Sequence, residues 1–172
     1  YDMYVRILSE EIANLKGEKV QGATAQTNVD LDISAYIDKS YINDDLSRLK
    51  MYKRIALVAS LSEKSDIIDE MIDRYGEPPL HVVNIIDVAY AKNLASKLGV
   101  AEITQIKKGI IITYEQHESA HFRNLTDVLD KGHHKYMVKM TDTLKIRVDT
   151  NEKGENMLTF LTKILEKALA AK

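Results

Sequence analysis

The chain has 172 residues, of which 45% are hydrophobic and 29% charged, so it is long and apolar enough to build a substantial core. Its 24 Lys and Arg against 26 Asp and Glu give a formal net charge of -2, so any attraction to nucleic acid or anionic lipid must come from a local patch. There is no cysteine, which excludes disulfides, thiolate chemistry and cysteine-type zinc sites and leads us to expect a cytoplasmic protein.

The N-terminal segment has the pattern of a helix followed by a linker. Apolar residues recur at steps of three to five over residues 2–16, which predicts an amphipathic helix that ends at Gly17. Residues 18–30 are polar and lack a helical period, as is typical of a surface linker. We therefore expect residues 1–21 to be a helix and linker from an upstream region and residues 22–172 to be a separate domain.

No apolar run reaches the roughly 20 residues of a membrane span. The chain starts with an acidic segment that lacks Met, so we expect it to be a piece of a longer protein.

One strand and two helices are predicted next. Apolar residues alternate with aspartates over residues 29–33, which is the period of a short strand with one wet face. Asn43 or Asp44 is expected to cap a helix that runs to about Ala59. Ser62 is expected to cap a second helix.

A corner between two helices is predicted at the run YGEPP. The second helix ends at Tyr75, and Gly76 suits the position after a helix. Pro78 or Pro79 suits the first turn of a new helix and cannot extend the old one. The helix that follows, to about Leu98, is apolar around much of its girth, which predicts a long buried helix with the others packed around it.

The last third of the chain is richer in strand-forming residues. Two hairpins are predicted, at residues 102–115 and 136–149, with a short helix at 122–129 between them and a final helix at 152–171. Helices followed by a ββαββα unit with antiparallel strands give an α+β fold.

Residues 117–121, HESAH, fit the pattern of zinc proteases. A zinc hydrolase would use His117, Glu118 and His121, with Asp127 as a conceivable further ligand. That mechanism needs both histidines on one face of a continuous helix, but strand-forming residues run almost into His117 and Ser119 suits a helix cap. The favoured interpretation is a solvated loop without a metal, and the zinc hydrolase remains an alternative.

A basic cluster lies on the first helix of the domain, at Arg48, Lys50, Lys53 and Arg54. Neither an aromatic-rich strand nor a recognition-helix pattern accompanies it, so a solvated face is favoured. An accessory nucleic-acid-binding module that uses Lys50, Lys53 and Arg54 remains a second alternative. The chain has no glycine-rich phosphate loop, so we expect no nucleotide cofactor.

The second helix carries a column of carboxylates, which we call the acidic stripe. Its members step by three, four and three residues, with one more beside them: Glu63, Asp66, Glu70 and Asp73, and Asp69. The other side is predicted to be buried through Ile68, Met71, Ile72 and Tyr75. Like charges at these spacings cost roughly 0.2 to 0.5 kcal/mol per pair, which favours a cationic partner surface over an uncovered stripe. An exposed stripe does not suit acid-base catalysis, which needs carboxylates in a cleft.

Two runs carry a resemblance to a known family. LSRLKMYKRIA (46–56) and DEMIDRYGEPPLHVVNIIDVAYAKNLASKLGV (69–100) resemble the C-terminal domain of the bacterial transcription-repair coupling factors. The ββαββα part matches in layout more than in residues. Two positions depart from the family, which commonly has prolines where this chain has Asp38 and Asn43. Residues 1–16 resemble the helix that follows the family's translocase motor, so the motor would lie upstream.

The resemblance implies a function for the acidic stripe. Members of the family displace stalled RNA polymerase and recruit the repair protein UvrA. Their C-terminal domain is non-catalytic and binds no cofactor; it packs against an N-terminal UvrB-like module of the same protein and hides the UvrA-binding surface. In the family, acidic residues of this domain contact arginines of that module, and the matching positions in this chain are Glu70 and Asp73. The resemblance therefore implies an autoinhibitory, protein-binding regulatory domain.

Overall fold

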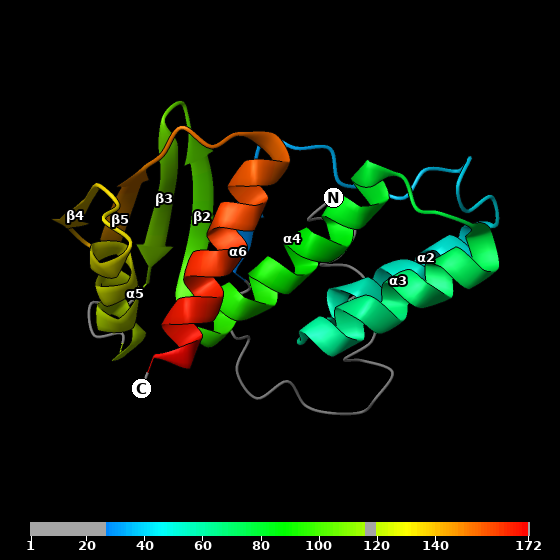
Figure 1. The fold of residues 1–172 in the computed structure, drawn as a ribbon, viewed down its shortest axis with the longest axis horizontal. Coiled ribbons are helices and arrows are strands. Elements are labelled where there is room, and N and C mark those ends of the chain that lie inside the picture. Colours follow the sequence, from blue (N-terminus) through cyan, green and yellow to red (C-terminus); the bar gives the residue numbers. More distant parts are fainter. Residues whose placement is uncertain (1–26, 116–119, 172) are drawn as a thin grey trace. The chain divides into compact units, whose positions relative to one another are not determined.

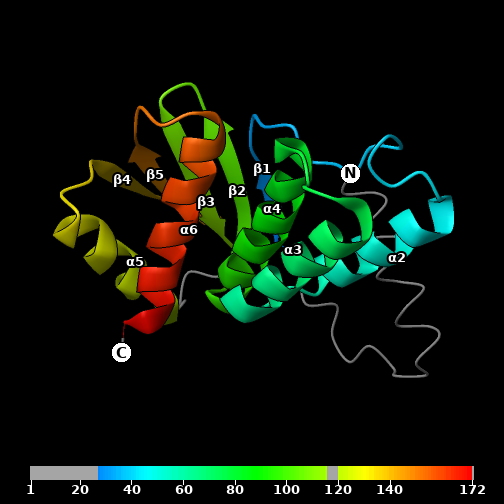
Figure 2. The same ribbon diagram turned by 45° about the vertical axis from the view of Figure 1, so that its right-hand side comes forward.

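The computed structural model describes residues 27–115 and 120–171, which form two compact units (Figures 1 and 2). Among these residues, the first unit comprises 34–90 and the second comprises 27–33 and 91–171. The helix expected over residues 2–16 and the boundary expected after residue 21 lie outside the described residues. The boundary between the two units falls within one helix, so the sections below treat each unit by itself.

The first unit is helical. It contains α2 (Asp45–Ala56), α3 (Leu61–Tyr75) and the beginning of α4 (Leu80–Lys97). Its core consists of buried apolar side chains from these helices and the segments between them: Ile42, Met51, Ile55, Val58, Ile67, Met71, Val82, Ile85 and Ile86. The buried positions of α4 are not confined to one stripe, because Asn84 and Ile86 are both buried although they lie about 200° apart around the helix axis. The predicted long buried helix is therefore confirmed.

The ends of α2 and α3 are set by side-chain caps. Asp44, one of the two expected caps, accepts a hydrogen bond from the Ser47 N–H at 2.7 Å. Ser60, and not Ser62, caps α3: its hydroxyl accepts from the Glu63 N–H at 3.2 Å. The Glu63 carboxylate in turn accepts from the Ala59 N–H at 2.7 Å. This reciprocal pair requires a glutamate three residues after the cap, which Ser60 has and Ser62 lacks. Consequently α2 ends at Ala56, earlier than predicted, and leaves residues 57–59 for the connection.

The predicted corner at YGEPP is confirmed. Gly76 has a φ of 83°, a left-handed value that glycine adopts without strain. The Tyr41 hydroxyl donates to the Gly76 carbonyl at 2.8 Å and so fixes the end of α3. The Pro79 carbonyl accepts from the N–H groups of Val82 and Val83, which places both prolines just before α4.

Asp38, at a position where the resembled family has proline, anchors the segment before α2. Its carboxylate binds the Ser40 hydroxyl and lies 2.7 Å from Nε2 of His81, whose ring stacks on Tyr36 with centroids 4.6 Å apart. The hydrogen bonds from Ser40 and then from His81 lower the pKa of Asp38 from 3.8 to about 2. The ionised carboxylate is thus the form that the folded chain prefers.

We expect Asp38→Asn to lower the urea midpoint at neutral pH and to have little effect at strongly acidic pH. Because the folded-state pKa is below the unfolded one, the carboxylate's contribution to stability is complete above about pH 4 and is lost as the pH falls through about 2. Urea unfolding of both proteins at several pH values checks this. Asp142→Asn, at an exposed residue of the second unit, is the control. A midpoint difference that persists at acidic pH would contradict the prediction.

The second unit is a five-stranded sheet covered by helices, and its strand order is β1-β2-β3-β5-β4. The strands are β1 (Asn28–Asp30), β2 (Val100–Ile106), β3 (Gly109–Tyr114), β4 (Tyr136–Met140) and β5 (Leu144–Asp149). The helices are α5 (Ala120–Lys131) and α6 (Gly154–Ala170). All pairs except the parallel pair β1-β2 are antiparallel. The predicted α+β fold with an antiparallel ββαββα unit is confirmed.

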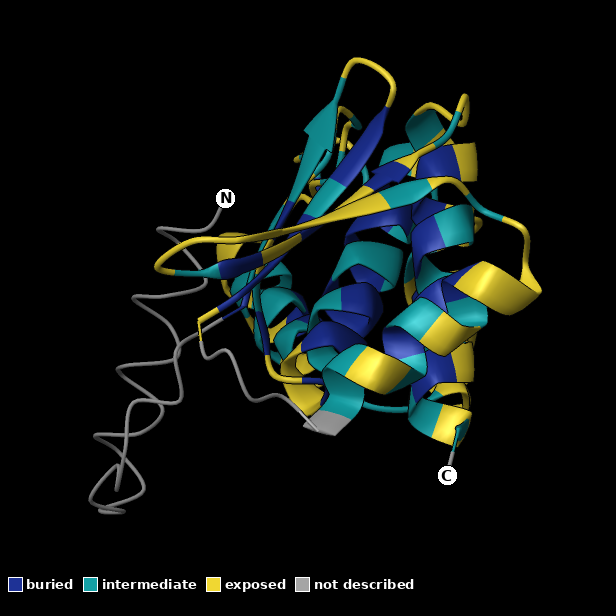
Figure 3. Ribbon diagram, turned by 90° about the vertical axis from the view of Figure 1, so that its left-hand side faces the viewer, coloured by how far each residue is buried: buried dark blue, intermediate teal, exposed yellow. Residues whose placement is uncertain are grey.

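The core of the second unit lies between one face of the sheet and the helices α5 and α6 (Figures 1 and 3). Alternate residues of β5 are buried, whereas the residues between them are exposed. The buried side chains come from the strands and both helices: Ile103, Ile110, Ile112, Leu125, Leu129, Ile146, Val148, Leu161 and Leu165. Across residues 27–115 and 120–171, every helix is too short or too polar to cross a membrane.

Candidate functional site

The outer side of α3 carries three exposed aspartates, which we call the aspartate face. Asp66, Asp69 and Asp73 are spaced by three and four residues, so they share one side of the helix. Ile67 and Met71 lie on the opposite side and are buried. Within the described residues, the three carboxylates have no hydrogen-bond or ion-pair partner. The aspartate face is therefore an unneutralised negative surface of the first unit.

The buried side of α3 differs in part from the prediction. Ile72 is exposed, with 38% of its surface accessible, and Ile67 takes the core position instead. Met71 is buried as predicted, while Ile68 and Tyr75 are half-buried. Ile67 and Met71 are four residues apart and point the same way, whereas Ile72 lies roughly 100° further round the helix. The buried side of α3, which we call the core seam, thus consists of Ile67 and Met71 and is narrower than the run of apolar residues suggests.

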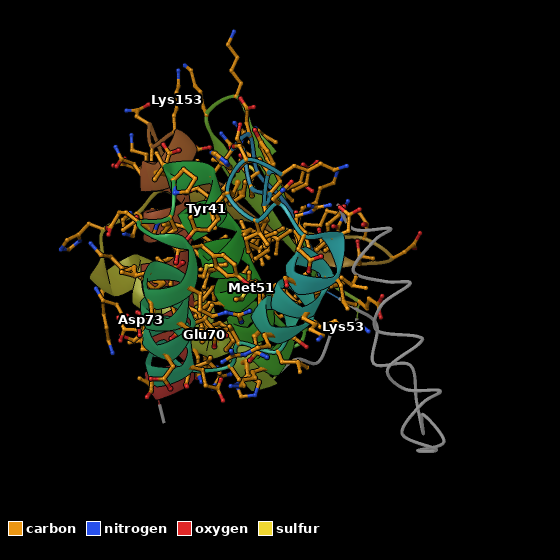
Figure 4. The ribbon with its side chains drawn as sticks, turned by 90° about the vertical axis from the view of Figure 1, so that its right-hand side faces the viewer. Tyr41, Met51, Lys53, Glu70, Asp73 and Lys153 are labelled. Atoms are coloured by element: carbon orange, nitrogen blue, oxygen red, sulfur yellow. The ribbon has the colours of Figure 1, made fainter. Side chains whose placement is uncertain are left out.

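Glu70 lies on α3 between the aspartate face and α2. Its carboxylate forms an ion pair with Arg54 of α2 and another with Arg74, whose Nη1 lies 2.9 Å from Oε1. The side chain is 28% exposed, and Figure 4 shows it beside α2 while Asp73 lies on the outer side. Glu70 is consequently neutralised within its own unit, which the sequence interpretation did not anticipate.

Glu63 also has a structural task, because its carboxylate completes the cap of α3 through the Ala59 N–H. Of the acidic stripe, Glu63 and Glu70 are therefore engaged within the unit, and Asp66, Asp69 and Asp73 remain available. The ion pair between Glu70 and Arg74 could have been predicted from the sequence, because the two residues are four apart on one helix. The contact with Arg54 could not be found in that way, because it joins two helices.

α3 is held firmly under the aspartate face. Lys64 forms an ion pair with Asp87 of α4, with Nζ and Oδ1 2.5 Å apart. Arg74 lies over the Tyr75 ring, with its Cζ 4.9 Å from the ring centroid, at the end of the helix. The ion pairs Lys64–Asp87 and Glu70–Arg54 and the buried side chain of Met71 tie α3 to its neighbours and fix its rotation about its axis. The three aspartates are thereby presented as a preformed surface.

The basic cluster on α2 is partly neutralised. Arg48 forms an ion pair with Asp45, donates to the Ile42 carbonyl at 3.0 Å and is only 16% exposed. Arg54 binds Glu70. Of the expected nucleic-acid residues, Lys50 and Lys53 form no ion pair in the described part of the chain, although, alongside the larger effect of hydrogen bonds from Ser47, the charge of Lys50 helps to lower the pKa of Asp44. Little charge is left for phosphate contacts.

The zinc hypothesis is tested only in part. His117 and Glu118 lie outside the described residues, and His121 lies in the first turn of α5. Asp127 is six residues further along the same helix, which places it roughly 240° around the axis from His121 and excludes joint coordination of one ion by these two. The described residues contain no group of three potential metal ligands.

Comparison with known proteins identifies the family. A model of the TRCF domain matches residues 31–125, which is more than half of the 172 residues. The chain belongs to the TRCF domain family. The resemblance to the C-terminal domain of transcription-repair coupling factors, expected from residues 46–56 and 69–100, is thereby confirmed.

Individual relatives agree with this assignment. The chain is 36% identical over 120 residues to the transcription-repair-coupling factor of Bacillus subtilis, an alignment that covers 70% of this chain and 10% of that protein. It is 27% identical over 177 residues to the transcription-repair-coupling factor of Escherichia coli, with 99% and 15% covered. The chain therefore spans only 10% to 15% of the length of these relatives.

A solved structure supports the fold. The crystal structure of a C-terminal domain of transcription-repair coupling factor superposes with a TM-score of 0.72 at 20% sequence identity. The superposition covers 86% of this chain and 97% of that one. At this identity the likeness supports the architecture and carries no information about individual site residues.

Proposed function

We propose that this TRCF domain is a non-catalytic regulatory domain of a cytoplasmic transcription-repair coupling factor. It docks on the UvrB-like N-terminal module of its parent protein and thereby masks the surface to which UvrA binds. The observation that carries the proposal is the aspartate face, in which Asp66, Asp69 and Asp73 share one side of α3 without a partner in the described residues. The names of the curated relatives support the setting in DNA repair coupled to transcription.

The carboxylates suit docking better than catalysis. Acid-base catalysis needs carboxyl groups in a cleft, where burial and neighbouring charges separate their pKa values. Asp66, Asp69 and Asp73 instead lie on the exposed side of a helix. Such a surface is complementary to arginines or lysines of a partner, and charge complementarity of this kind sets orientation and specificity.

We call the docking of this domain on the UvrB-like module the clamp. The interaction energies are those expected of a clamp that can open. Solvent-exposed ion pairs contribute about 0 to 1 kcal/mol each, so three aspartates would supply up to about 3 kcal/mol. Within one polypeptide, tethering adds an effective concentration that reaches roughly the millimolar range for short flexible linkers. Closure is then favoured but weak. Engagement of RNA polymerase by the parent protein would shift the population toward the open state and expose the UvrA surface.

We expect the triple substitution Asp66→Lys, Asp69→Lys and Asp73→Lys in the full parent protein to raise its affinity for UvrA about tenfold, as a shift of about 1.4 kcal/mol toward the open state requires. Calorimetric titration of UvrA into the parent protein measures this. The 172-residue chain carrying the same changes should keep its melting temperature, since all three residues are exposed. Glu70 is left unchanged because reversing it would place a third arginine or lysine beside Arg54 and Arg74.

The control replaces two exposed acidic residues of the second unit, Asp142→Lys with Glu152→Lys, which alters net charge without touching α3. This control should leave UvrA affinity unchanged. Equal UvrA affinity of the triple variant and the unmodified parent protein would refute the clamp.

A further inference from the structure

The strand β4 leaves one edge of the sheet exposed. It is last in the strand order β1-β2-β3-β5-β4 and pairs only with β5 among the described strands. Four of its five residues are exposed, and the accessible fractions of Met137, Val138 and Met140 are 68%, 41% and 67%. Exposed hydrophobic edge strands are ready templates for pairing with another chain, and soluble proteins normally protect them. The free edge of β4 can therefore pair with a strand of another chain.

The face of the sheet away from α5 and α6 is basic beside this edge. Lys139 of β4 lies directly opposite Lys145 of β5, and Met137 lies opposite Arg147. Like charges directly opposite each other in a strand pair are destabilising, so Lys139 and Lys145 repel unless an anion lies between or beside them. Within the described ranges, Arg147 is the one cation of the three that forms an ion pair with a carboxylate, and its Nε lies 3.0 Å from Oδ1 of Asp149.

The same basic face continues past the start of β4. Lys135 precedes the strand by one residue, so the strand period places it on the side of Met137 and Lys139. A depression of about 430 Å³ lies here; it is lined by Lys108, His133, His134, Lys135, Arg147 and Asp149, among others. Cations from the β2–β3 turn, from the residue before β4 and from β5 thus line a depression at the end of β5, near the start of β4.

The two sides of β4 differ in chemistry. Tyr136, Val138 and Met140 are opposite Val148, Ile146 and Leu144, the buried residues of β5, and so lie on the apolar side of the sheet. Lys135, Met137 and Lys139 lie on the basic side. A strand added to this edge would continue both sides, because neighbouring strands align their alternating side chains. It would need acidic residues on one side and apolar residues on the other.

We propose that β4 binds an extended segment of a partner protein, in which acidic and apolar residues alternate, by strand addition to the sheet. Main-chain hydrogen bonds to the free edge supply affinity, and the alternating side chains supply specificity. The acidic residues contact Lys135, Lys139 and Lys145, and the apolar ones cover Val138 and Met140. This surface belongs to the second unit and uses none of the α3 residues, so it is independent of the proposed clamp.

Other occupants fit less well. Pairing of β4 with β4 of a second copy would bring the lysines of two basic faces together, which is repulsive. A nucleic acid would satisfy the cations but would leave the exposed Met137, Val138 and Met140 unused. The strand also lacks an aromatic residue on its basic side for base stacking, since Tyr136 lies on the other side, where a hydrogen bond to Asp130 raises the pKa of Tyr136.

The test uses the full 172-residue chain and a fluorescent, end-capped peptide of alternating glutamate and valine. We expect saturable binding by fluorescence anisotropy that weakens as salt is raised, and about tenfold weaker binding of the matching glutamine-valine peptide. Lys139→Glu with Lys145→Glu should weaken binding by about tenfold or more. Lys163→Glu, a charge reversal at an exposed position of α6, should leave it unchanged.

Strand addition has its own signature. The backbone amide resonances of β4 should shift on titration, and those of α3 should not. Two further peptides test this, one N-methylated at its valines and the other at its glutamates. Only one of the two should lose binding, because the N–H groups of alternate residues point to opposite edges of a strand. Equal affinity for the glutamine peptide, stronger competition by duplex DNA than by unlabelled peptide, or self-association of the chain through β4 would each overturn the proposal.

Discussion

Replacing Gly109 with alanine is expected to destabilise the protein by about 2 to 6 kcal/mol, since backbone strain and overpacking each cost about 1 to 3 kcal/mol. Gly109 has a φ of 144°, which residues with a Cβ rarely adopt. A Cβ at this position would also overlap the Val148 carbonyl oxygen on the neighbouring strand. Since Gly109 pairs with Ile106 and Asp149, the change disturbs both sides of β3.

Urea unfolding of the purified chain measures this loss, and Gly76→Ala provides a matched control. Gly76 also has a left-handed φ, of 83°, but no atom lies within 4 Å of the Cβ that alanine would add. With a ψ of -174° it lies in a backbone region used almost only by glycine, so its substitution should cost the backbone term alone, about 1 to 3 kcal/mol. If the two variants lost equal stability, the contact with Val148 would not be the cause. Because β4 is attached to the sheet through β5, Gly109→Ala should also weaken binding of the glutamate-valine peptide.

Local signals in the sequence predicted most elements well. The corner at YGEPP and both hairpins follow from turn residues and side-chain periods, which act over a few neighbouring residues. The capping error at Ser62 was avoidable, because Ser60 and Glu63 have the spacing of a capping box. The strand expected over residues 29–33 is shorter in the structure, where β1 ends at Asp30.

Long-range pairing could not be predicted in the same way. β1 pairs in parallel with β2, more than seventy residues away, with Val29 opposite Ile103. Nothing in a single sequence specifies this partner, since register depends on which buried faces meet in three dimensions. The edge position of β4 has the same origin, because β5 lies between β3 and β4 although it follows both in the chain.

The candidate site shows the same division. The spacing of the acidic residues correctly placed Asp66, Asp69 and Asp73 on one side of α3. It could not show that Glu70 is neutralised by Arg54, a residue of another helix, because charge patterning describes only one helix at a time. The aspartate face is thus a subset of the acidic stripe, selected by tertiary contacts.

The buried side of α3 leads to the second large effect: we expect Met71→Ala to destabilise the first unit by about 2 to 5 kcal/mol. Met71 is fully buried, so its loss removes apolar contacts and leaves a cavity. Ile72→Ala is the matched control at the adjacent residue, which is 38% exposed, and it should cost less than about 1 kcal/mol. Thermal and urea unfolding of both variants compare them directly.

This pair of variants also separates the two roles of α3. If the aspartate face acts only when Met71 holds the helix in place, Met71→Ala in the full parent protein should raise UvrA affinity as the aspartate substitutions do, and Ile72→Ala should not. The aspartate variants should act without loss of stability, because exposed charges contribute little to folding. Equal destabilisation by Met71→Ala and Ile72→Ala would show that the core seam through Ile67 and Met71 is misplaced, and with it the direction in which the aspartates point.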